Sequence, residues 1–118
     1  MPERVTFLQA QPALPVADVE RAFAFYAELG FRKHYQNGYC HLLVEKDGVI
    51  LHLATQIVRG TGGCQILVQG VDRLHTRALA AGVEMLHPLQ DEPWGTRDFT
   101  VLDPDGNAVT FAEVRASA

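Results

Sequence analysis

The sequence predicts an α+β fold built from two tandem βαβββ modules. A strand-like pattern followed by a helix-like pattern occupies residues 14–31, and the same order returns without a gap at residues 66–83, which is 66 − 14 = 52 positions later. Each helix-like pattern ends at a glycine, Gly30 or Gly82, a residue that accepts the left-handed backbone at a helix C-terminus. Neither half could bury its apolar face alone, so the two halves are expected to pack together and to leave a pocket between or around them.

The composition is that of one globular domain spanning residues 1–118, with half-modules at about 5–56 and 63–115. Hydrophobic residues make up 47% of the chain, and no apolar run approaches the roughly 20 residues of a membrane helix. The net charge of −4 disfavours a nucleic-acid partner, which needs clustered Lys and Arg, and is compatible with a cationic ligand. With neither a membrane segment nor a signal-peptide pattern, the expected location is the cytoplasm.

Residues 6–14 are expected to form the first strand, and Pro12 and Pro15 restrict it to a sheet edge or to an arm exchanged with another subunit. Asp18 is a good N-cap for the helix that follows. The apolar residues of this helix are spaced to form one buried face. They are Val19, Ala22, Phe23, Tyr26 and Leu29.

Three strands are expected next, at residues 31–36, 39–45 and 49–54. Asn37-Gly38 is a strong hairpin signal between the first two, and Asp47-Gly48 turns the chain into the third. The glycine-rich residues 57–63 would then link the two halves.

The second half repeats this order with a strand at 64–68, a helix at 71–81, and strands at 84–89, 97–102 and 108–114. A polar loop leads to the third of these four strands, and the turn-forming residues 103–106 join the last two. Cys40 and Cys64 form no CxxC pair and lie in apolar strand-like runs, so we expect reduced, partly buried thiols rather than a disulfide.

The motifs of the chain resemble those of the vicinal oxygen chelate superfamily, which includes glyoxalase I, extradiol dioxygenases and the bleomycin-resistance proteins. They are Phe25-Tyr26 late in the first helix, Leu29-Gly30-Phe31 after it, and Asp103-Pro104-Asp105-Gly106-Asn107 near the C-terminus. The resemblance implies that the sheets are curved, mixed and arranged around a groove.

Within this superfamily, the chain is most similar to the bleomycin-resistance (bleomycin-binding) proteins. Their opening resembles Pro12-x-Leu14-Pro15-x-x-Asp18, and their C-terminal signature resembles Glu92-Pro93-Trp94-Gly95, followed by Arg97-Asp98-Phe99 and Asp103-Pro104. The resemblance implies a homodimer with two equivalent grooves. It leaves open whether the N-terminal strand packs on the partner or is exchanged with it.

The enzymes of the superfamily bind a divalent metal through four equivalent strand positions, which correspond here to Gln11, His52, Gly63 and Thr110. Gly63 has no side chain and Thr110 is a poor, neutral ligand, whereas a stable site uses three or four His, Cys or carboxylate groups. We therefore expect no metal, no other cofactor and no catalytic residue. The alternative is a register shift by one residue, which would replace Gly63 by Cys64 and leave a weak site of Gln11, His52 and Cys64.

Three residues are candidate ligand contacts from their local setting. Trp94 is the only tryptophan and lies between Pro93 and Gly95, where no core periodicity requires an indole, so it is suited to stacking on an aromatic ligand. Tyr39 follows the predicted hairpin turn, at the place where resistance proteins carry a stacking aromatic. His41 lies two residues further, on the same strand face. The structural alternatives are a loop aromatic that covers the sheet edge and a hairpin aromatic that packs on its neighbouring strand.

His52, between Leu51 and Leu53, is expected to line the pocket, with a hydrogen-bonded core histidine as the alternative. The resemblance adds Gln11, Phe99 and Thr110 to the expected ligand-binding set. No Ser-His-Asp or Cys-His spacing suggests a nucleophile.

The resemblance to bleomycin-resistance proteins implies a non-catalytic protein that binds a small molecule and sequesters a glycopeptide-type or other aromatic antibiotic. The alternatives are a metal-dependent lyase or dioxygenase of the same superfamily and an orphan ligand-binding module with another natural ligand. Fold and groove alone do not identify a ligand, so the sequence leaves the last alternative open.

Overall fold

The computed structural model describes residues 5–55 and 60–115 and confirms the predicted βαβββ order in both halves. The first half contains β1 (Ala13–Pro15), α1 (Val19–Glu28), β2 (Arg32–Asn37), β3 (His41–Lys46) and β4 (Val49–Ala54). The second contains β5 (Gly63–Leu67), α2 (Val71–Ala80), β6 (Glu84–Asp91), β7 (Thr96–Leu102) and β8 (Ala108–Val114). Neither of these helices is both long and apolar enough to cross a membrane.

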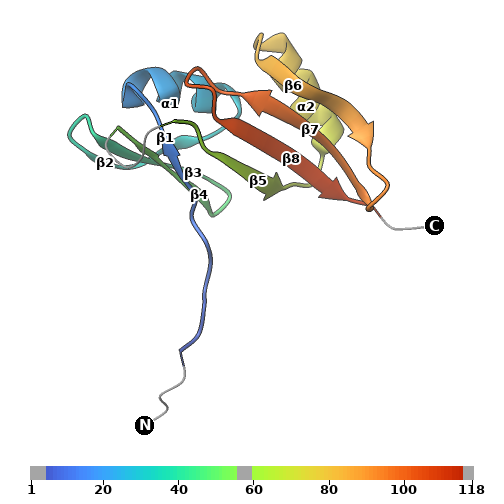
Figure 1. The fold of residues 1–118 in the computed structure, drawn as a ribbon, viewed down its shortest axis with the longest axis horizontal. Helices are drawn as coiled ribbons and strands as arrows, with labels where there is room; N and C mark the ends of the chain where they lie inside the picture. The colour runs from blue at the N-terminus through green and yellow to red at the C-terminus, as the bar shows by residue number, and fades with distance from the viewer. Residues whose placement is uncertain (1–4, 56–59, 116–118) are drawn as a thin grey trace.

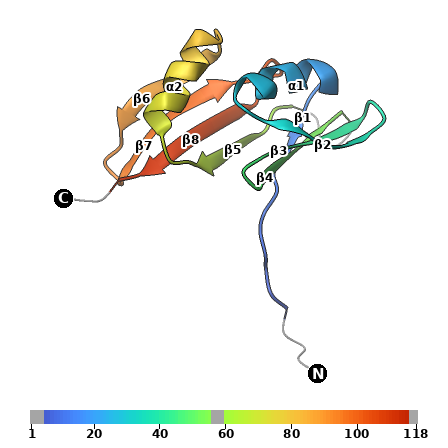
Figure 2. The same ribbon diagram turned by 180° about the vertical axis from the view of Figure 1, so that it is seen from behind.

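Each half forms one four-stranded mixed sheet, with strand orders β1-β4-β3-β2 and β5-β8-β7-β6. The first strand of each half pairs in parallel with the last, and the other pairings are antiparallel. Both helices lie on the same side of the sheets, as Figures 1 and 2 show from opposite directions. The opposite side carries no described helix, and we call it the open face.

The alternation of side chains along the strands separates the core from the open face. The helix-covered side contains the fully buried residues of both halves, among them Leu14, Leu42, Leu51, Phe99 and Val109. The open face contains the residues between them, which include Tyr35, His41, Leu43 and His52 in the first sheet and Gln65, Asp98, Thr100 and Thr110 in the second.

The two repeated helices are capped in different ways. The Asp18 side chain caps α1 by accepting hydrogen bonds from the backbone N–H groups of Glu20 (2.9 Å) and Arg21 (3.2 Å). Helix α2 has Gly70 as its N-cap, which offers no capping side chain. The backbone N–H groups of Gly70 and Val71 donate instead to Oε1 of Glu113 on β8. These backbone donors lower the pKa of the Glu113 carboxyl. The long-range cap therefore ties α2 to its own sheet.

A buried polar network closes the second module and was not predicted. The Asp103 carboxylate accepts hydrogen bonds from the Tyr26 hydroxyl and from the Asn107 side chain, both at 2.8 Å. It also accepts from the backbone N–H groups of Asp105 and Asn107. Because Tyr26 belongs to α1, the turn between β7 and β8, which contains Asp103, connects the two modules.

The N-terminal strand is much shorter than predicted. Only Ala13–Pro15 pair with β4, and the preceding residues run away from both sheets (Figure 1). Three of their apolar side chains are almost fully exposed: Val5 (79%), Phe7 (94%) and Leu8 (89%). We call residues 5–12 the N-terminal arm. Its outer part has no neighbouring strand in the described chain with which to form a ladder.

Candidate functional site

Three predicted site residues form one hydrogen-bonded row on the open face of the first sheet. Nε2 of His41 lies 2.9 Å from Nδ1 of His52, and Nε2 of His52 lies 2.7 Å from Oε1 of Gln11. The backbone N–H of His52 also donates to the Pro12 carbonyl at 2.9 Å. Strands β3 and β4 therefore position the histidines, and His52 holds the base of the N-terminal arm.

The row defines the tautomers of both imidazoles. The Gln11 oxygen can only accept, so Nε2 of His52 carries a proton and Nδ1 of His52 is an acceptor. His41 then donates through its Nε2. A proton added to Nδ1 of His52 would face the N–H of His41, so this arrangement holds His52 neutral.

The pKa of His52 is lowered, first by burial and then by the nearby His41. Folding therefore favours neutral His52, and its contribution to stability is present above the unfolded-state pKa of about 6.5 and declines as the pH falls below that value. We expect the loss of thermal stability between about pH 7.5 and about pH 5.5 to be smaller in His52→Gln than in the wild type. His87→Gln is the control, because it removes an exposed histidine that lies outside the His41–His52–Gln11 row. Equal pH dependence in all three proteins would contradict this assignment.

On the second sheet, Thr110 lies on the open face and its hydroxyl is 2.7 Å from that of Thr100 on β7. The hydroxyl of Thr96 donates to Asp98 at 2.8 Å on the same strand. Asp98 and Thr100 are 6% and 7% exposed and were not predicted as site residues. Their signal in the sequence was the alternation of polar Asp98 and Thr100 with apolar Phe99 and Val101 along this strand.

Phe99, which was included in the predicted ligand-binding set, lies in the core. It is fully buried on the helix-covered side and packs on Phe111 (5.5 Å between ring centroids) and on His75 of α2 (5.1 Å). A strand side chain between Asp98 and Thr100 points to the opposite face. Phe99 therefore does not border the surface that carries the other candidates.

The two candidate stacking aromatics are exposed and distant from one another. Tyr39, 83% exposed, lies in the β2–β3 turn, and Trp94, 71% exposed, lies in the β6–β7 turn. These turns are at opposite ends of the protomer (Figure 1). One protomer therefore cannot bring both rings to one small ligand.

The metal positions of the superfamily's enzymes do not fit a metal here. Gly63 supplies no donor, Thr110 is already paired with Thr100, and only Gln11 and His52 remain. The alternative with Cys64 is wrong, because the register places Cys64 beside buried Val109, whereas Gly63 and Gln65 flank it on the open face. Within residues 5–55 and 60–115, no three His, Cys, Asp or Glu side chains are grouped to hold a metal ion.

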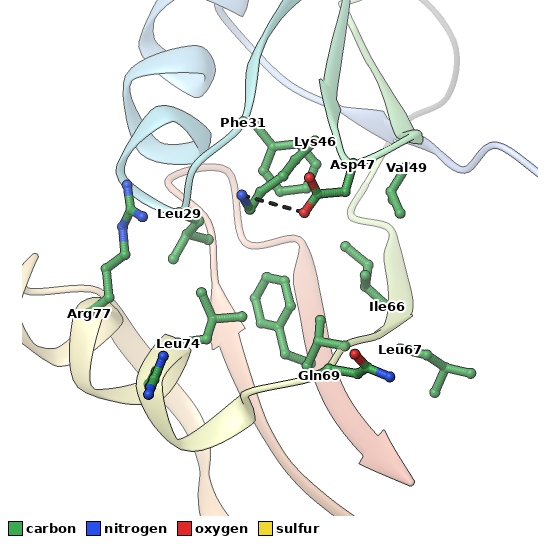
Figure 3. Close-up of a pocket in the computed structure, with 13 residues that line it drawn as sticks. Leu29, Phe31, Lys46, Asp47, Val49, Ile66, Leu67, Gln69, Leu74 and Arg77 are labelled. Atoms are coloured by element: carbon green, nitrogen blue, oxygen red, sulfur yellow. Dashed lines mark ion pairs between the residues drawn. The ribbon is translucent and has the colours of Figure 1, made fainter.

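A cavity of about 520 Å³ lies on the other side of the sheets, where the two modules meet. We call it the seam cavity. The end of α1 and the β3–β4 turn border it on one side, and β5 and α2 on the other (Figure 3). Its walls are apolar, and its charged lining residues are Lys46, Asp47, Arg73 and Arg77. The repeat predicts a pocket between or around the halves, but it did not identify any of these charged residues.

A family model described as the Glyoxalase/Bleomycin resistance protein/Dioxygenase superfamily matches residues 8–111. A bleomycin resistance protein of Geobacillus stearothermophilus is 34% identical over 127 residues, covering 88% of this chain and 95% of its own. Among solved structures, the bleomycin-binding protein of bleomycin-producing Streptomyces verticillus, complexed with copper(II)-bleomycin, is 28% identical, with 97% of this chain and 100% of that one covered and a TM-score of 0.76.

The same fold recurs at lower identity. A bleomycin resistance determinant encoded on the transposon Tn5 superimposes with a TM-score of 0.81 at 18% identity, covering 93% of this chain and 100% of that one. The repeated modules, the sheet topology and the match over nearly the whole chain lead to one conclusion. The protein belongs to the glyoxalase/bleomycin resistance protein/dioxygenase superfamily, and its curated relatives within it are bleomycin resistance proteins.

Proposed function

We propose that this protein binds a bleomycin-like glycopeptide antibiotic and sequesters it without turnover. The observation that carries the proposal is the 34% identity to a bleomycin resistance protein over 88% of the chain. The relative solved with copper(II)-bleomycin, at 28% identity, supports the same ligand class. The free thiols of Cys40 and Cys64 are in keeping with action in the reducing cytoplasm.

The chemistry of the open face supports binding rather than catalysis. Several of its polar side chains hydrogen-bond to one another, as in the His41–His52–Gln11 row and the Thr100–Thr110 pair. Such groups orient a ligand through hydrogen bonds. They form no pair of nucleophile and general base. The donor set at the superfamily's metal positions also disfavours the Lewis-acid chemistry of a lyase or dioxygenase.

We propose that the ligand groove is completed by a second copy of the chain. Tyr39 and Trp94 lie at opposite ends of one protomer, so a groove that uses both aromatics needs one from each subunit. A two-fold dimer in which the first sheet of one protomer faces the second sheet of its partner would create two such grooves. The N-terminal arm, with Phe7 and Leu8 exposed, would then bury its apolar side chains against the partner.

The protein is accordingly expected to sediment at about 10 μM as a dimer of twice 13.0 kDa. Phe7→Ser should weaken the dimer, because it removes an apolar side chain that we place in the interface. Leu79→Ser is the matched control, since Leu79 is exposed on the outer surface of α2 and should leave the mass unchanged. A mass of 13.0 kDa for the wild type, or equal effects of both variants, would contradict this arrangement.

Tryptophan fluorescence tests the ligand class. Metal-free bleomycin should change the emission of the single Trp94 in a saturable way, and a panel of unrelated aromatic antibiotics should compete weakly or not at all. Saturable binding of another antibiotic in preference to bleomycin would identify an orphan binding module instead.

A further inference from the structure

We infer that the seam cavity binds a small monocarboxylate with an aromatic or branched aliphatic body, and that Arg73 and the backbone N–H of Gln69 hold its carboxylate. This site is separate from the proposed antibiotic groove. Ile66 and Phe111, which line the cavity, point to the helix-covered side of their strands, whereas the groove candidates lie on the open face.

The internal repeat supplies a template for carboxylate binding at the equivalent place in the first half. Nη2 of Arg21 on α1 lies 2.8 Å from Oδ1 of Asp105. The backbone N–H of Ala17 donates to the same oxygen at 2.9 Å. A guanidinium and a backbone N–H, four residues apart, therefore hold one carboxylate, which reaches them from the β7–β8 turn of the other module. We call this pair of donors, Arg21 and Ala17 in the first half, the carboxylate cradle.

The 52-residue repeat places Arg73 where Arg21 stands and Gln69 where Ala17 stands, since 21 + 52 = 73 and 17 + 52 = 69. Both residues line the seam cavity. Among the described residues, the Arg73 guanidinium has no ion pair or hydrogen bond and the Gln69 N–H has no acceptor. The two positions that hold Asp105 in one half are thus repeated in the sequence of the other half, where no carboxylate of the described residues is bound to them.

Two differences between the halves explain why the second cradle is open. The β7–β8 turn contains five residues, 103–107, and carries Asp105 to Arg21, whereas Asp47 and Gly48 alone join β3 to β4. Asp47 lines the cavity, but its carboxylate is 84% exposed and lies 3.5 Å from the Lys46 amine. In addition, Tyr26 fills the first seam and donates to Asp103, whereas its repeat equivalent is the small Ala78.

The rest of the cavity selects an apolar monoanion. Leu29 and Phe31 from the first module face Ile66 and Leu74 from the second, as Figure 3 shows. Three cationic side chains and one carboxylate line the space, so its local charge is +2. Arg77 is fixed at the rim because its Nε donates to the Glu28 carbonyl at 2.8 Å. A cavity of about 520 Å³ is in the range that accommodates a small organic ligand.

Phenylacetate is a suitable probe, and its neutral amide, phenylacetamide, is the matched control with the same ring. Titrated into the full-length ¹⁵N-labelled protein, phenylacetate should shift the backbone amide resonances of residues 67–74 saturably, with the largest change at Gln69. The amide should bind at least about tenfold more weakly, because it cannot form the charge-assisted hydrogen bonds to Arg73. Equal binding of acid and amide, or saturable shifts confined to open-face residues, would overturn the inference.

Arg73→Met keeps the length of the side chain but removes its charge, and should weaken phenylacetate binding at least about tenfold. Arg32→Met makes the same change of net charge on β2, outside the cavity, and should alter the affinity by less than about twofold. Both variants should bind bleomycin as the wild type does. A negative result for the phenylacetate site can therefore be distinguished from a negative result for the proposed bleomycin binding. An unchanged phenylacetate affinity in Arg73→Met would overturn the site. Shifts at residues 67–74 that depend on protein concentration without probe would also overturn it, because they would show that a second copy covers the cavity.

Discussion

Replacing Asn107 with alanine is expected to lower the free energy of unfolding by about 3 kcal/mol, because it leaves several buried polar groups without partners. The Asn107 side chain is fully buried. Its Nδ2 donates to the Pro15 carbonyl and to Oδ2 of Asp103, each at 2.8 Å, and its Oδ1 accepts from the Gly62 N–H at 2.6 Å. One amide thus joins the end of β1, the approach to β5 and the β7–β8 turn.

Equilibrium denaturation with urea measures this effect, and Asn37→Ala is the matched control. Asn37 is exposed at the end of β2, and its side chain makes no hydrogen bond to a described residue, so its loss should cost less than about 0.5 kcal/mol. A cost below about 1 kcal/mol for Asn107→Ala would show that the three segments hold together without this side chain.

Trp94→Ala is expected to weaken binding of bleomycin by roughly 1–3 kcal/mol while leaving the fold nearly as stable as in the wild type. The indole is 71% exposed, so little apolar surface is lost from the folded protein. The turn that carries it is held by backbone hydrogen bonds, from Glu92 N to Thr96 O (2.7 Å) and from Gly95 N to Glu92 O (3.1 Å). These bonds do not depend on the side chain at position 94.

The melting temperature and the calorimetric affinity should be measured on the same Trp94→Ala preparation. Leu79→Ala removes an exposed apolar side chain from α2, outside the proposed groove, and should change neither quantity appreciably. A sharply lower melting temperature with unchanged affinity per folded molecule would make Trp94 a structural residue. It would also remove the main reason for placing the groove beside the β6–β7 turn.

The element order was predictable because each signal is local. Helix periodicity, the Asn37-Gly38 turn and the glycine after each helix are properties of neighbouring residues, and the repeat gave the helix and glycine signals twice. The N-terminal strand was overestimated for the opposite reason. Residues 6–14 have the composition of a strand, but a strand needs a partner edge, and the described chain offers one only to Ala13–Pro15.

The open face was predicted in part. His41, His52 and Gln11, all members of the predicted ligand-binding set, lie together on it, although the sequence did not predict that they hydrogen-bond to one another. Phe99 could have been excluded from the sequence, because a residue flanked by Asp98 and Thr100 faces away from both. The separation of Tyr39 from Trp94 could not be predicted, since it depends on how the two sheets are placed relative to each other.

The seam cavity depends on differences between the repeats rather than on their similarity. Aligning the halves pairs Tyr26 with Ala78. A small residue in place of a large one was the signal in the sequence for a cavity in the second half. The alignment alone does not identify Arg73 as a carboxylate-binding residue. That inference also requires the structure, which shows that Asp105 of the β7–β8 turn pairs with Arg21 of the other module.

Titration calorimetry of metal-free bleomycin with the full-length protein, followed by mass analysis of the recovered drug, tests the central claim most directly. Sequestration predicts saturable binding with one drug molecule per chain, which is two per proposed dimer, and a recovered drug of unchanged mass after the protein is denatured. Absence of binding at drug concentrations up to about 100 μM, or recovery of a chemically altered drug, would contradict it.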